Sequence, residues 1–222
     1  MAIAENLEKI LGEIPDDVQL IAISKTKSNE EIMEAYRQGQ RILGENKVQE
    51  LTAKQPDLPK DIQWHFVGHL QSNKVKQIAP FISLIHSVDK LKLLKEINKR
   101  AKNEDRVIDC LLQFHIAEEE SKFGLDVEEA KDLINSEIFP QLQHMRIRGV
   151  MGMATFTENE DQIRKEFKML KNSFDFLKAN YFRESEHFSE ISMGMTNDYK
   201  IAIEEGSTMV RIGSAIFGER NY

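Results

Sequence analysis

The chain has 222 residues and carries 30 Lys and Arg against 37 Asp and Glu, which gives a formal net charge of -7. This acidic balance argues against a general nucleic-acid-binding or membrane-surface protein, because both of those partners attract basic surfaces. The length and a hydrophobic content of 41% suit a globular protein, and a single α/β barrel of roughly 250 residues is typical of this size class.

The cysteines, the histidines and the N-terminal residues exclude further kinds of protein and site. The single cysteine, Cys110, excludes an intramolecular disulfide and a CxxC metal motif, which fits a reducing compartment. The six histidines show no HxH or HExxH spacing, so we predict no metal site. The first residues, MAIAENLEKILGEI, do not resemble a signal peptide, and no later stretch is long enough to span a bilayer. These features predict a cytoplasmic protein without a membrane or nucleic-acid partner.

Short apolar runs alternate with amphipathic helical patterns along the whole chain. A first helix is predicted at residues 3–11. The predicted strands lie at residues 20–24, 41–44, 64–67, 84–87, 107–115, 149–154, 188–192 and 209–213. The predicted helices between them lie at residues 29–38, 47–54, 70–78, 90–102, 127–138, 161–179 and 198–205. The order predicts an α/β protein.

Eight strands that alternate with helices are the order of a (β/α)8 TIM barrel, here a single domain over residues 1–222. A doubly wound open sheet of similar length is the alternative. In either fold, ligands bind at the carboxyl ends of the strands. The residues that end each predicted strand are therefore the candidates for a site.

Lys25 ends the first predicted strand, directly after the apolar run LIAIS. A lysine there can extend into solvent from the strand end, or it can be held at the edge of the core as a nucleophile. Asn46 follows the second predicted strand within the motif GENKVQE. The strand pattern alone leaves both interpretations of Lys25 open.

The last two strands are followed by small and hydroxyl-bearing residues. Ser192, Gly194 and Thr196 follow the seventh strand, and Thr196 is expected to be the N-cap of the next helix. Gly213 and Ser214 follow the eighth and begin a short predicted helix at residues 214–217. Barrels often bind phosphate between the loops after these two strands. The alternative is that the residues form only tight turns and helix caps.

Arg211 lies inside the last apolar strand, where a charged side chain needs a partner. That partner could be a structural ion pair or an acceptor atom on a ligand. A lysine at the first strand, beside a phosphate site on the eighth, suggests a phosphate that carries an aldehyde. Pyridoxal 5'-phosphate (PLP), bound to Lys25 as a Schiff base, is such a ligand.

Five ordered motifs carry a closer resemblance. IAISKTK, GENKVQE, WHFVGHLQSNK, SMGMTNDY and AIEEGSTMVRIGSAIFGER closely resemble the pyridoxal phosphate homeostasis protein family, over about residues 20–218. The resemblance implies a single barrel of PLP fold type III, like the N-terminal domain of bacterial alanine racemase. It implies a chain without the C-terminal β domain of that enzyme, for which the end at Tyr222 leaves no room.

The resemblance also implies roles for single residues. It implies a Schiff base on Lys25, a ring nitrogen near Arg211, and a pocket lined by Asn46. It implies that phosphate is held by the SMGMT loop, with Ser192, Gly194 and Thr196, and by Gly213 and Ser214. Thr196 departs from the serine usual in the family but retains a hydroxyl. A permanent cation near the pyridine nitrogen disfavours its protonation, which would restrain carbanion chemistry.

Three functions are compatible with these residues. The first is a monomeric, non-enzymatic protein that holds PLP, buffers it and delivers it to apo-enzymes. The second is a minimal racemase or decarboxylase, with His65, Tyr199 or Lys74 as acid or base. The third is a Schiff-base aldolase without a cofactor. Lys27 and Lys122 are the alternative sites for a Schiff base if Lys25 is not the attachment point.

Overall fold

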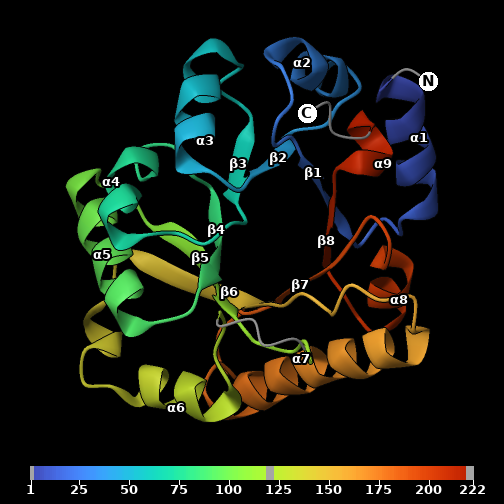
Figure 1. Ribbon diagram of the computed structural model, residues 1–222. Coiled ribbons are helices and arrows are strands. Elements are labelled where there is room, and N and C mark those ends of the chain that lie inside the picture. Colours follow the sequence, from blue (N-terminus) through green and yellow to red (C-terminus); the bar gives the residue numbers. More distant parts are fainter. Residues whose placement is uncertain (1–2, 119–122, 219–222) are drawn as a thin grey trace.

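The computed structural model describes residues 3–118 and 123–218 of the chain. Its parallel strands form a closed barrel in which each strand pairs with the next and β8 pairs with β1 (Figure 1). The predicted barrel is therefore confirmed, and the open-sheet alternative is wrong. The strands are β1 (Gln19–Ile23), β2 (Ile42–Glu45), β3 (Gln63–Phe66), β4 (Leu84–Val88), β5 (Ile108–Gln113), β6 (Met145–Met151), β7 (Glu190–Met195) and β8 (Met209–Ile212).

Helices surround the barrel and connect its strands (Figure 1). Within the described residues they are α1 (Ile3–Glu13), α2 (Asn29–Arg37), α3 (Val48–Lys54), α4 (Val75–Ile78), α5 (Leu91–Asn103), α6 (Val127–Asn135), α7 (Glu160–Asn180), α8 (Tyr199–Glu204) and α9 (Ser214–Phe217). Short 3-10 helices lie at η1 (Gln55–Asp57), η2 (Ser72–Lys74) and η3 (Phe139–Gln141). Helices α1 and α9 lie side by side, and the side-chain amide of Asn6 donates to the carbonyl oxygen of Ile216 at 3.0 Å.

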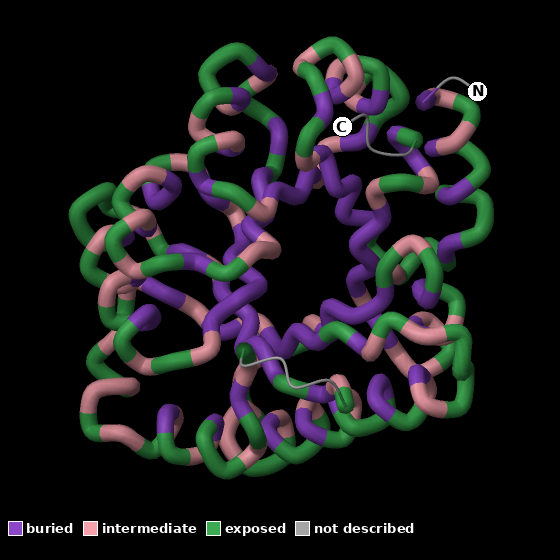
Figure 2. Tube along the Cα trace, in the orientation of Figure 1, coloured by how far each residue is buried: buried purple, intermediate pink, exposed green. Residues whose placement is uncertain are grey.

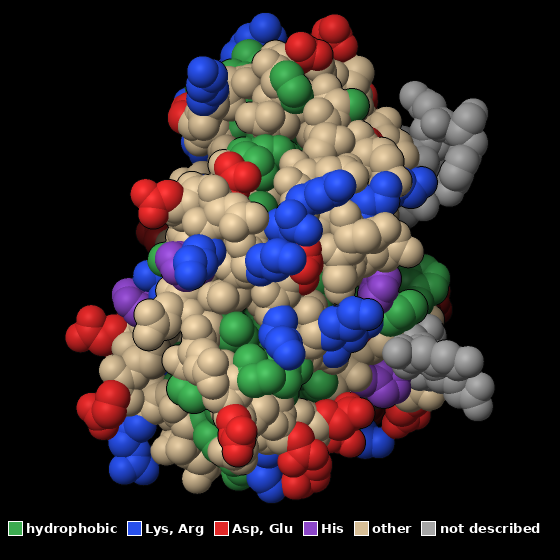
Figure 3. Space-filling model, turned by 90° about the vertical axis from the view of Figure 1, so that its left-hand side faces the viewer, with side chains coloured by type: hydrophobic (Ala, Val, Ile, Leu, Met, Phe, Trp, Pro, Cys, Tyr) green, Lys and Arg blue, Asp and Glu red, His purple; other side chains and the backbone are tan. Residues whose placement is uncertain are grey.

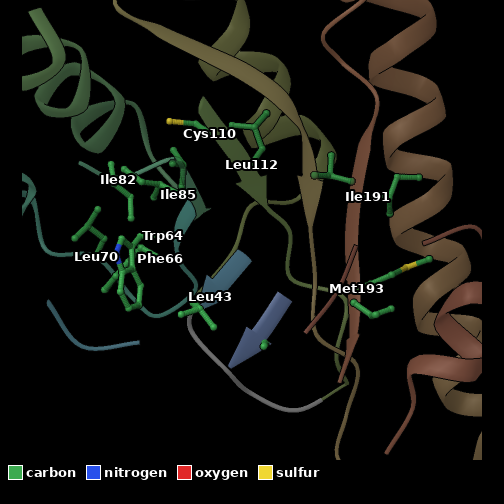
Figure 4. Packing of buried hydrophobic residues seen from close by; sticks show 14 of the residues in the cluster. Leu43, Trp64, Phe66, Leu70, Ile82, Ile85, Cys110, Leu112, Ile191 and Met193 are labelled. Carbon is green, nitrogen blue, oxygen red and sulfur yellow. The ribbon is translucent and has the colours of Figure 1, made fainter. Parts of the chain in front are cut away.

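The sheet separates two apolar layers, because successive side chains of a strand point to opposite faces. In β1, Leu20 and Ala22 join the large cluster between sheet and helices, whereas Ile21 and Ile23 join a small separate cluster. The small cluster fills the barrel interior with Leu84, Leu111, Met151 and Met209. Figure 2 shows the strands as a buried ring, and Figure 4 shows the large cluster around Trp64 and Phe66.

The outer faces of the helices carry the charge. Lys92, Lys95 and Lys99 project from α5 around a shallow groove, while its opposite face packs Leu93, Leu94 and Ile97 against the barrel. Lys and Arg side chains gather across the side of the molecule shown in Figure 3. Of the helices that the structure describes, none is both long and apolar enough to cross a membrane.

Two predicted strands are displaced along the chain. Strand β6 begins at Met145 instead of residue 149. The predicted strand began too late because Arg146 and Arg148 interrupt the apolar pattern of this segment. Both arginines pair with Asp109 of the neighbouring strand, at 2.7 and 3.0 Å, so their charges are satisfied within the sheet. Strand β7 continues to Met195 instead of ending at residue 192. Serine and glycine in this segment indicated a loop, but Met193 is fully buried there.

Two predicted helices are too long. The helix expected at residues 70–78 is the 3-10 helix η2 followed by the single turn α4. The helix expected at residues 127–138 ends at Asn135, and the chain then forms η3 around Pro140. Proline cannot donate a backbone hydrogen bond and disfavours a helical residue before it. The other strand and helix boundaries agree with the prediction within two residues.

Candidate functional site

A cavity of about 550 Å³ lies at the carboxyl ends of the strands. Most of the predicted site residues line it, namely Lys25, Asn46, Thr196, Arg211, Gly213 and Ser214. These residues follow or end β1, β2, β7 and β8, so the closed barrel brings together positions from both ends of the sequence. The strand-end argument therefore selected residues that share one cavity.

Lys25 lies half-buried in a tight turn between β1 and α2. The N–H of Lys27 donates to the carbonyl of Ser24 at 3.1 Å, and Thr26 has a positive φ of 64°. The chain then enters α2 through a capping box, in which the side chains of Ser28 and Glu31 each accept the other residue's backbone N–H. Both ends of the turn are thus fixed, and Lys25 is presented to the cavity.

A buried ionic cluster of side chains from β2 and α3 fixes this turn. The ammonium of Lys54 donates to Glu45 at 2.9 Å, to Glu50 at 2.6 Å and to the carbonyl of Ser24 at 2.8 Å. The Ser24 hydroxyl also donates to Glu45, at 2.6 Å, and the N–H of Thr26 donates to Glu50. The cluster therefore ties the backbone on both sides of Lys25 to β2 and α3.

Glu45 is the least solvated member of this cluster. Its side chain is fully buried, and its Oε2 has no hydrogen-bond partner among the described residues. Burial raises the pKa of the Glu45 carboxyl, while the charge of Lys54 opposes that rise. Sequence reasoning missed Glu45, Glu50 and Lys54, although the first two belong to the motif GENKVQE. The available signal was a pair of acidic residues flanking the start of a helix.

Asn46 follows β2 and lines the cavity next to the loop after β3. A Cβ atom at Gly68 would lie only 2.2 Å from the carbonyl oxygen of Asn46. Glycine is therefore needed where these two loops meet. The contact fixes Asn46 at the cavity wall, as predicted from the motif around it.

The loops after β7 and β8 meet as the phosphate hypothesis requires. The hydroxyl of Ser214 donates to the hydroxyl of Thr196 at 3.3 Å. Gly213 is the N-cap of α9, and the first N–H groups of a helix have no partner within it. Two hydroxyls and backbone donors thus gather beside Arg211 at one wall of the cavity.

Thr196 is not the N-cap of the following helix, which corrects the prediction. Helix α8 begins at Tyr199, and Asp198 occupies the N-cap position. The Asp198 carboxylate accepts from the N–H of Met195 at 2.5 Å, which closes the loop and leaves Thr196 at the cavity wall. Burial raises the pKa of Asp198, and the Met195 N–H and the charge of Arg211 oppose that rise.

Ser192 and Gly194 are not part of the cavity wall. The fully buried hydroxyl of Ser192 accepts from Arg211 at 2.6 Å and lies 2.9 Å from Nδ1 of His86. Gly194 has a φ of 89°, and a Cβ there would lie 2.5 Å from Cβ of Ala202 in α8. The phosphate contacts expected of both residues stay predictions, while their observed contacts lie within the protein.

We expect Gly194→Ala to lower the free energy of unfolding by about 1–3 kcal/mol more than Gly39→Ala does. Both glycines have similar positive φ values, 89° and 94°, but nothing lies within 4 Å of a Cβ built at Gly39. The difference therefore isolates the packing of β7 against α8 from backbone strain. Urea unfolding of the two variants measures it, and equal losses would contradict the packing argument.

Arg211 is buried and lines the cavity. Its guanidinium donates to Ser192 and to the carbonyl of Gly152, at 2.6 and 2.9 Å. Arg211 forms no ion pair within the described ranges, so the structural ion pair considered from the sequence is not observed. Burial lowers the pKa of Arg211 to about 10, against the opposing charge of Asp198. The cavity therefore contains a cation that neutral groups hold in place.

Of the other candidates, Lys27 lines the cavity, whereas the candidate acids and bases His65, Tyr199 and Lys74 lie outside its wall. His65 is buried in the barrel, where its Nδ1 lies 3.0 Å from Nε2 of His86. The Tyr199 hydroxyl donates to Glu13. Burial, and to a smaller extent this hydrogen bond, raises the pKa of Tyr199 to about 12. Lys74 lies in η2. Lys122 lies outside the described residues.

Two further features complete the site. The mouth of the cavity is apolar, with Phe123, Met153, Phe156 and Met195 all partly exposed there, and Phe156 has 83% of its surface exposed. Cys110 is buried, and its burial raises the pKa of the thiol. The described residues contain no group of three or more His, Cys, Asp or Glu that could hold a metal ion.

Comparison with known proteins places this geometry in a family. The family model of the alanine racemase N-terminal domain matches residues 1–221. The pyridoxal phosphate homeostasis protein of Aquifex aeolicus (strain VF5) is 40% identical over 205 residues, which are 92% of this chain and 88% of that protein. The chain belongs to the pyridoxal phosphate homeostasis protein family.

Other members of the pyridoxal phosphate homeostasis protein family agree. The protein of Escherichia coli (strain K12) is 35% identical over 218 residues, covering 95% of this chain and 89% of that one. PipY of Synechococcus elongatus PCC7942, solved with PLP bound, superposes with a TM-score of 0.85 at 34% identity, covering 97% of this chain and 100% of PipY. Alanine racemase of Clostridium difficile 630 shares the fold, with a TM-score of 0.72 at 13% identity, over 56% of its length.

Proposed function

We propose that this protein binds PLP in the strand-end cavity and serves intracellular PLP homeostasis, holding the cofactor on Lys25 and buffering or delivering it. The observation that carries the proposal is that one cavity is lined by Lys25, by Arg211 and by the hydrogen-bonded hydroxyls of Thr196 and Ser214. It is supported by PipY, a relative at 34% identity whose structure was solved with PLP bound.

The residues present fit this cofactor. The cavity of about 550 Å³ has the size of a small-molecule site. Arg211 is a buried cation that forms no ion pair in the described chain, although the charge of Asp198 acts on it, and such a cation favours an anionic or electron-rich ligand. The hydroxyls of Thr196 and Ser214 and the first N–H groups of α9 offer donors to a phosphate. When bound, PLP supplies an aldehyde and a conjugated ring that withdraws electrons.

Lys25 would attach the cofactor, because its amine can condense with the aldehyde that PLP supplies and release water. The turn between Ser24 and Lys27, tied to Glu50 and Lys54, keeps Lys25 at the cavity edge during this step. By the family resemblance, Arg211 would face the ring nitrogen and Asn46 would line the side of the pocket.

A carrier fits this site better than a racemase or decarboxylase. Arg211 disfavours a protonated ring nitrogen, which weakens the ring as an electron sink. His65, Tyr199 and Lys74, the candidate acids and bases, do not line the cavity. The apolar mouth with the exposed Phe156 suits contact with an accepting enzyme. The proposal includes a monomeric, single-domain, cytoplasmic protein that needs no metal.

The delivery function is tested by transfer. The PLP-loaded protein is mixed with the apo form of a PLP-dependent enzyme, and recovery of that enzyme's activity is compared with recovery from an equal amount of free PLP. We expect faster recovery from the loaded protein. In a parallel test in deuterated water, exchange of the Cα hydrogen of any amino acid at enzymatic rates would overturn the carrier assignment in favour of a racemase-type enzyme.

Arg211→Met is expected to weaken PLP binding at least about tenfold, because the cavity loses its buried cation. The same change removes a desolvated charge that has no ion-pair partner among the described residues, so the cofactor-free variant should unfold at a higher temperature than the wild type. Fluorescence titration and thermal unfolding measure the two effects. An unchanged PLP affinity would contradict the role of Arg211.

A further inference from the structure

A chain of buried side chains crosses the barrel interior and ends at Arg211. Nδ1 of His65 in β3 lies 3.0 Å from Nε2 of His86 in β4, and Nδ1 of His86 lies 2.9 Å from the hydroxyl oxygen of Ser192 in β7. Arg211 in β8 donates to that oxygen at 2.6 Å. All of these side chains are at most 4% exposed, so each polar atom needs a hydrogen-bond partner.

The hydrogen bonds of this chain can run in only one direction. A guanidinium has donors and no acceptor, so the Ser192 oxygen accepts from Arg211. The single hydroxyl hydrogen of Ser192 must then be donated to Nδ1 of His86, because no other acceptor for it lies among the described residues. His86 in turn donates from Nε2 to Nδ1 of His65. Both histidines therefore carry their proton on Nε2.

The environment keeps both histidines neutral, as this direction requires. Burial, reinforced by the repulsion that a protonated His86 would meet from Arg211, holds the pKa of His86 well below its usual value. Burial also lowers the pKa of His65 to about 3, against the opposing charge of Asp109. Neither imidazole can compete with Arg211 for a proton at neutral pH, so Arg211 is the cation among these four hydrogen-bonded side chains.

We infer that Ser192, His86 and His65 are positioning residues that hold the guanidinium of Arg211 toward the cofactor cavity without cancelling its charge. The inference rests on the proposed PLP binding. A carboxylate in the place of Ser192 would also hold Arg211, but it would form an ion pair and remove the positive charge from the cavity. Two neutral acceptors, the Ser192 hydroxyl and the Gly152 carbonyl, hold the guanidinium and leave its charge available to the ligand.

The first test uses the cofactor-free protein, so it does not depend on PLP. Nitrogen-15 NMR of the histidine side chains should show His65 and His86 as neutral tautomers protonated on Nε2. In Ser192→Ala, the bond that fixes His86 is lost, so the resonances of its ring nitrogens should shift. A wild-type protein in which either histidine is protonated on Nδ1 would overturn the inference, whatever its affinity for PLP.

The second test measures PLP binding. Ser192→Ala should weaken it about tenfold and shift the visible absorption of the bound cofactor, because Arg211 loses a charge-assisted bond that orients it. Ser192→Thr, which retains the hydroxyl, should restore both. Ser192→Asp should bind PLP more weakly than Ser192→Ala does, since its carboxylate cancels the charge of Arg211. Binding by Ser192→Asp equal to that of the wild type would refute the charge argument.

Ser207→Ala is the matched control. Ser207 is also a buried serine, 4% exposed, and its hydroxyl lies 2.8 and 2.9 Å from the carbonyl oxygens of Met193 and Met209, outside the hydrogen-bonded chain that ends at Arg211. It should lower stability without altering the histidine tautomers or the absorption of bound PLP. If Ser192→Ala behaves in the same way, the hydrogen-bonded side chains contribute only to stability and do not position Arg211. Should the wild type bind no PLP, the proposed function fails while the tautomer result stands on its own.

Discussion

Replacement of Lys25 by alanine is expected to abolish the covalent attachment of PLP. The visible absorption of the loaded protein should be lost, and borohydride reduction should leave no label on the chain. Lys25 is a half-buried lysine two residues after the end of β1, and its turn is fixed to β2 and α3 by the buried cluster around Lys54. Without the covalent bond, PLP affinity should fall by at least about tenfold. Absorption spectra and peptide mapping of the reduced protein measure both effects.

Two other lysines make the test of Lys25 specific. Lys47→Ala removes an exposed lysine next to Asn46 and should leave the label in place. Lys27 also lines the cavity, but its ammonium donates to the carbonyl of Phe217 at 2.8 Å and pairs with Glu31 at 3.3 Å. Lys27→Ala should therefore retain the label and reduce stability. A label on Lys27 or Lys122 in the wild type would overturn the assignment of Lys25.

Lys54→Met is expected to lower the free energy of unfolding by about 3–5 kcal/mol, a large part of the stability of a typical domain. Lys54 is the cation within ion-pair distance of Glu45, whose side chain is fully buried and already has one oxygen without a partner in the described chain. Removing the ammonium leaves an uncompensated buried carboxylate. The turn that carries Lys25 also loses its anchor on the carbonyl of Ser24. Urea unfolding measures the loss.

The loss should depend on pH, because burial raises the pKa of Glu45 and loss of Lys54 raises it further. A carboxyl with a raised pKa in the folded state binds its proton more tightly there than in the unfolded chain. Stability then falls as the pH rises from about 4.5, the unfolded value, to the pKa of the folded state. Lys54→Met should therefore be least destabilised at low pH, and Glu45→Gln combined with it should restore part of the loss.

Lys200→Met is the control for the buried pair. Lys200 also forms an ion pair, with Glu13 at 2.8 Å, but its side chain is 67% exposed. Exposed pairs contribute little, so this variant should lose less than about 1 kcal/mol at any pH. If Lys54→Met lost no more than Lys200→Met, the buried cluster would not support the turn of Lys25 as described.

The sequence allowed the barrel to be predicted because its strands are buried on both faces and its helices on one. Those patterns are local, and they also place Lys25, Asn46 and Gly213 at strand ends. The direction of a side chain within a strand depends instead on where that strand ends. Ser192 seemed to begin a loop and so to face a ligand, but β7 continues to Met195. Ser192 thus lies within the barrel wall, where it contacts Arg211.

Contacts between distant residues were beyond the reach of local patterns. Nothing in the spacing of Glu45 and Lys54 shows that a buried carboxylate and an ammonium meet beneath Lys25. The exposed aromatic side chain of Phe156 lies in a loop that carried no strand or helix signal. Such features depend on the tertiary packing of loops, which hydrophobic periodicity does not encode.

The pairing of β1 with β8 has a consequence for folding. Ile21 pairs with Arg211, so the seam joins segments that lie far apart in the sequence, and such non-local pairing forms slowly. Lys25 lies on one side of this seam and Gly213 on the other. A ligand that bridges them binds only after the seam has closed, and it opposes reopening by mass action. The cellular supply of PLP would then govern how long each newly made copy stays intact.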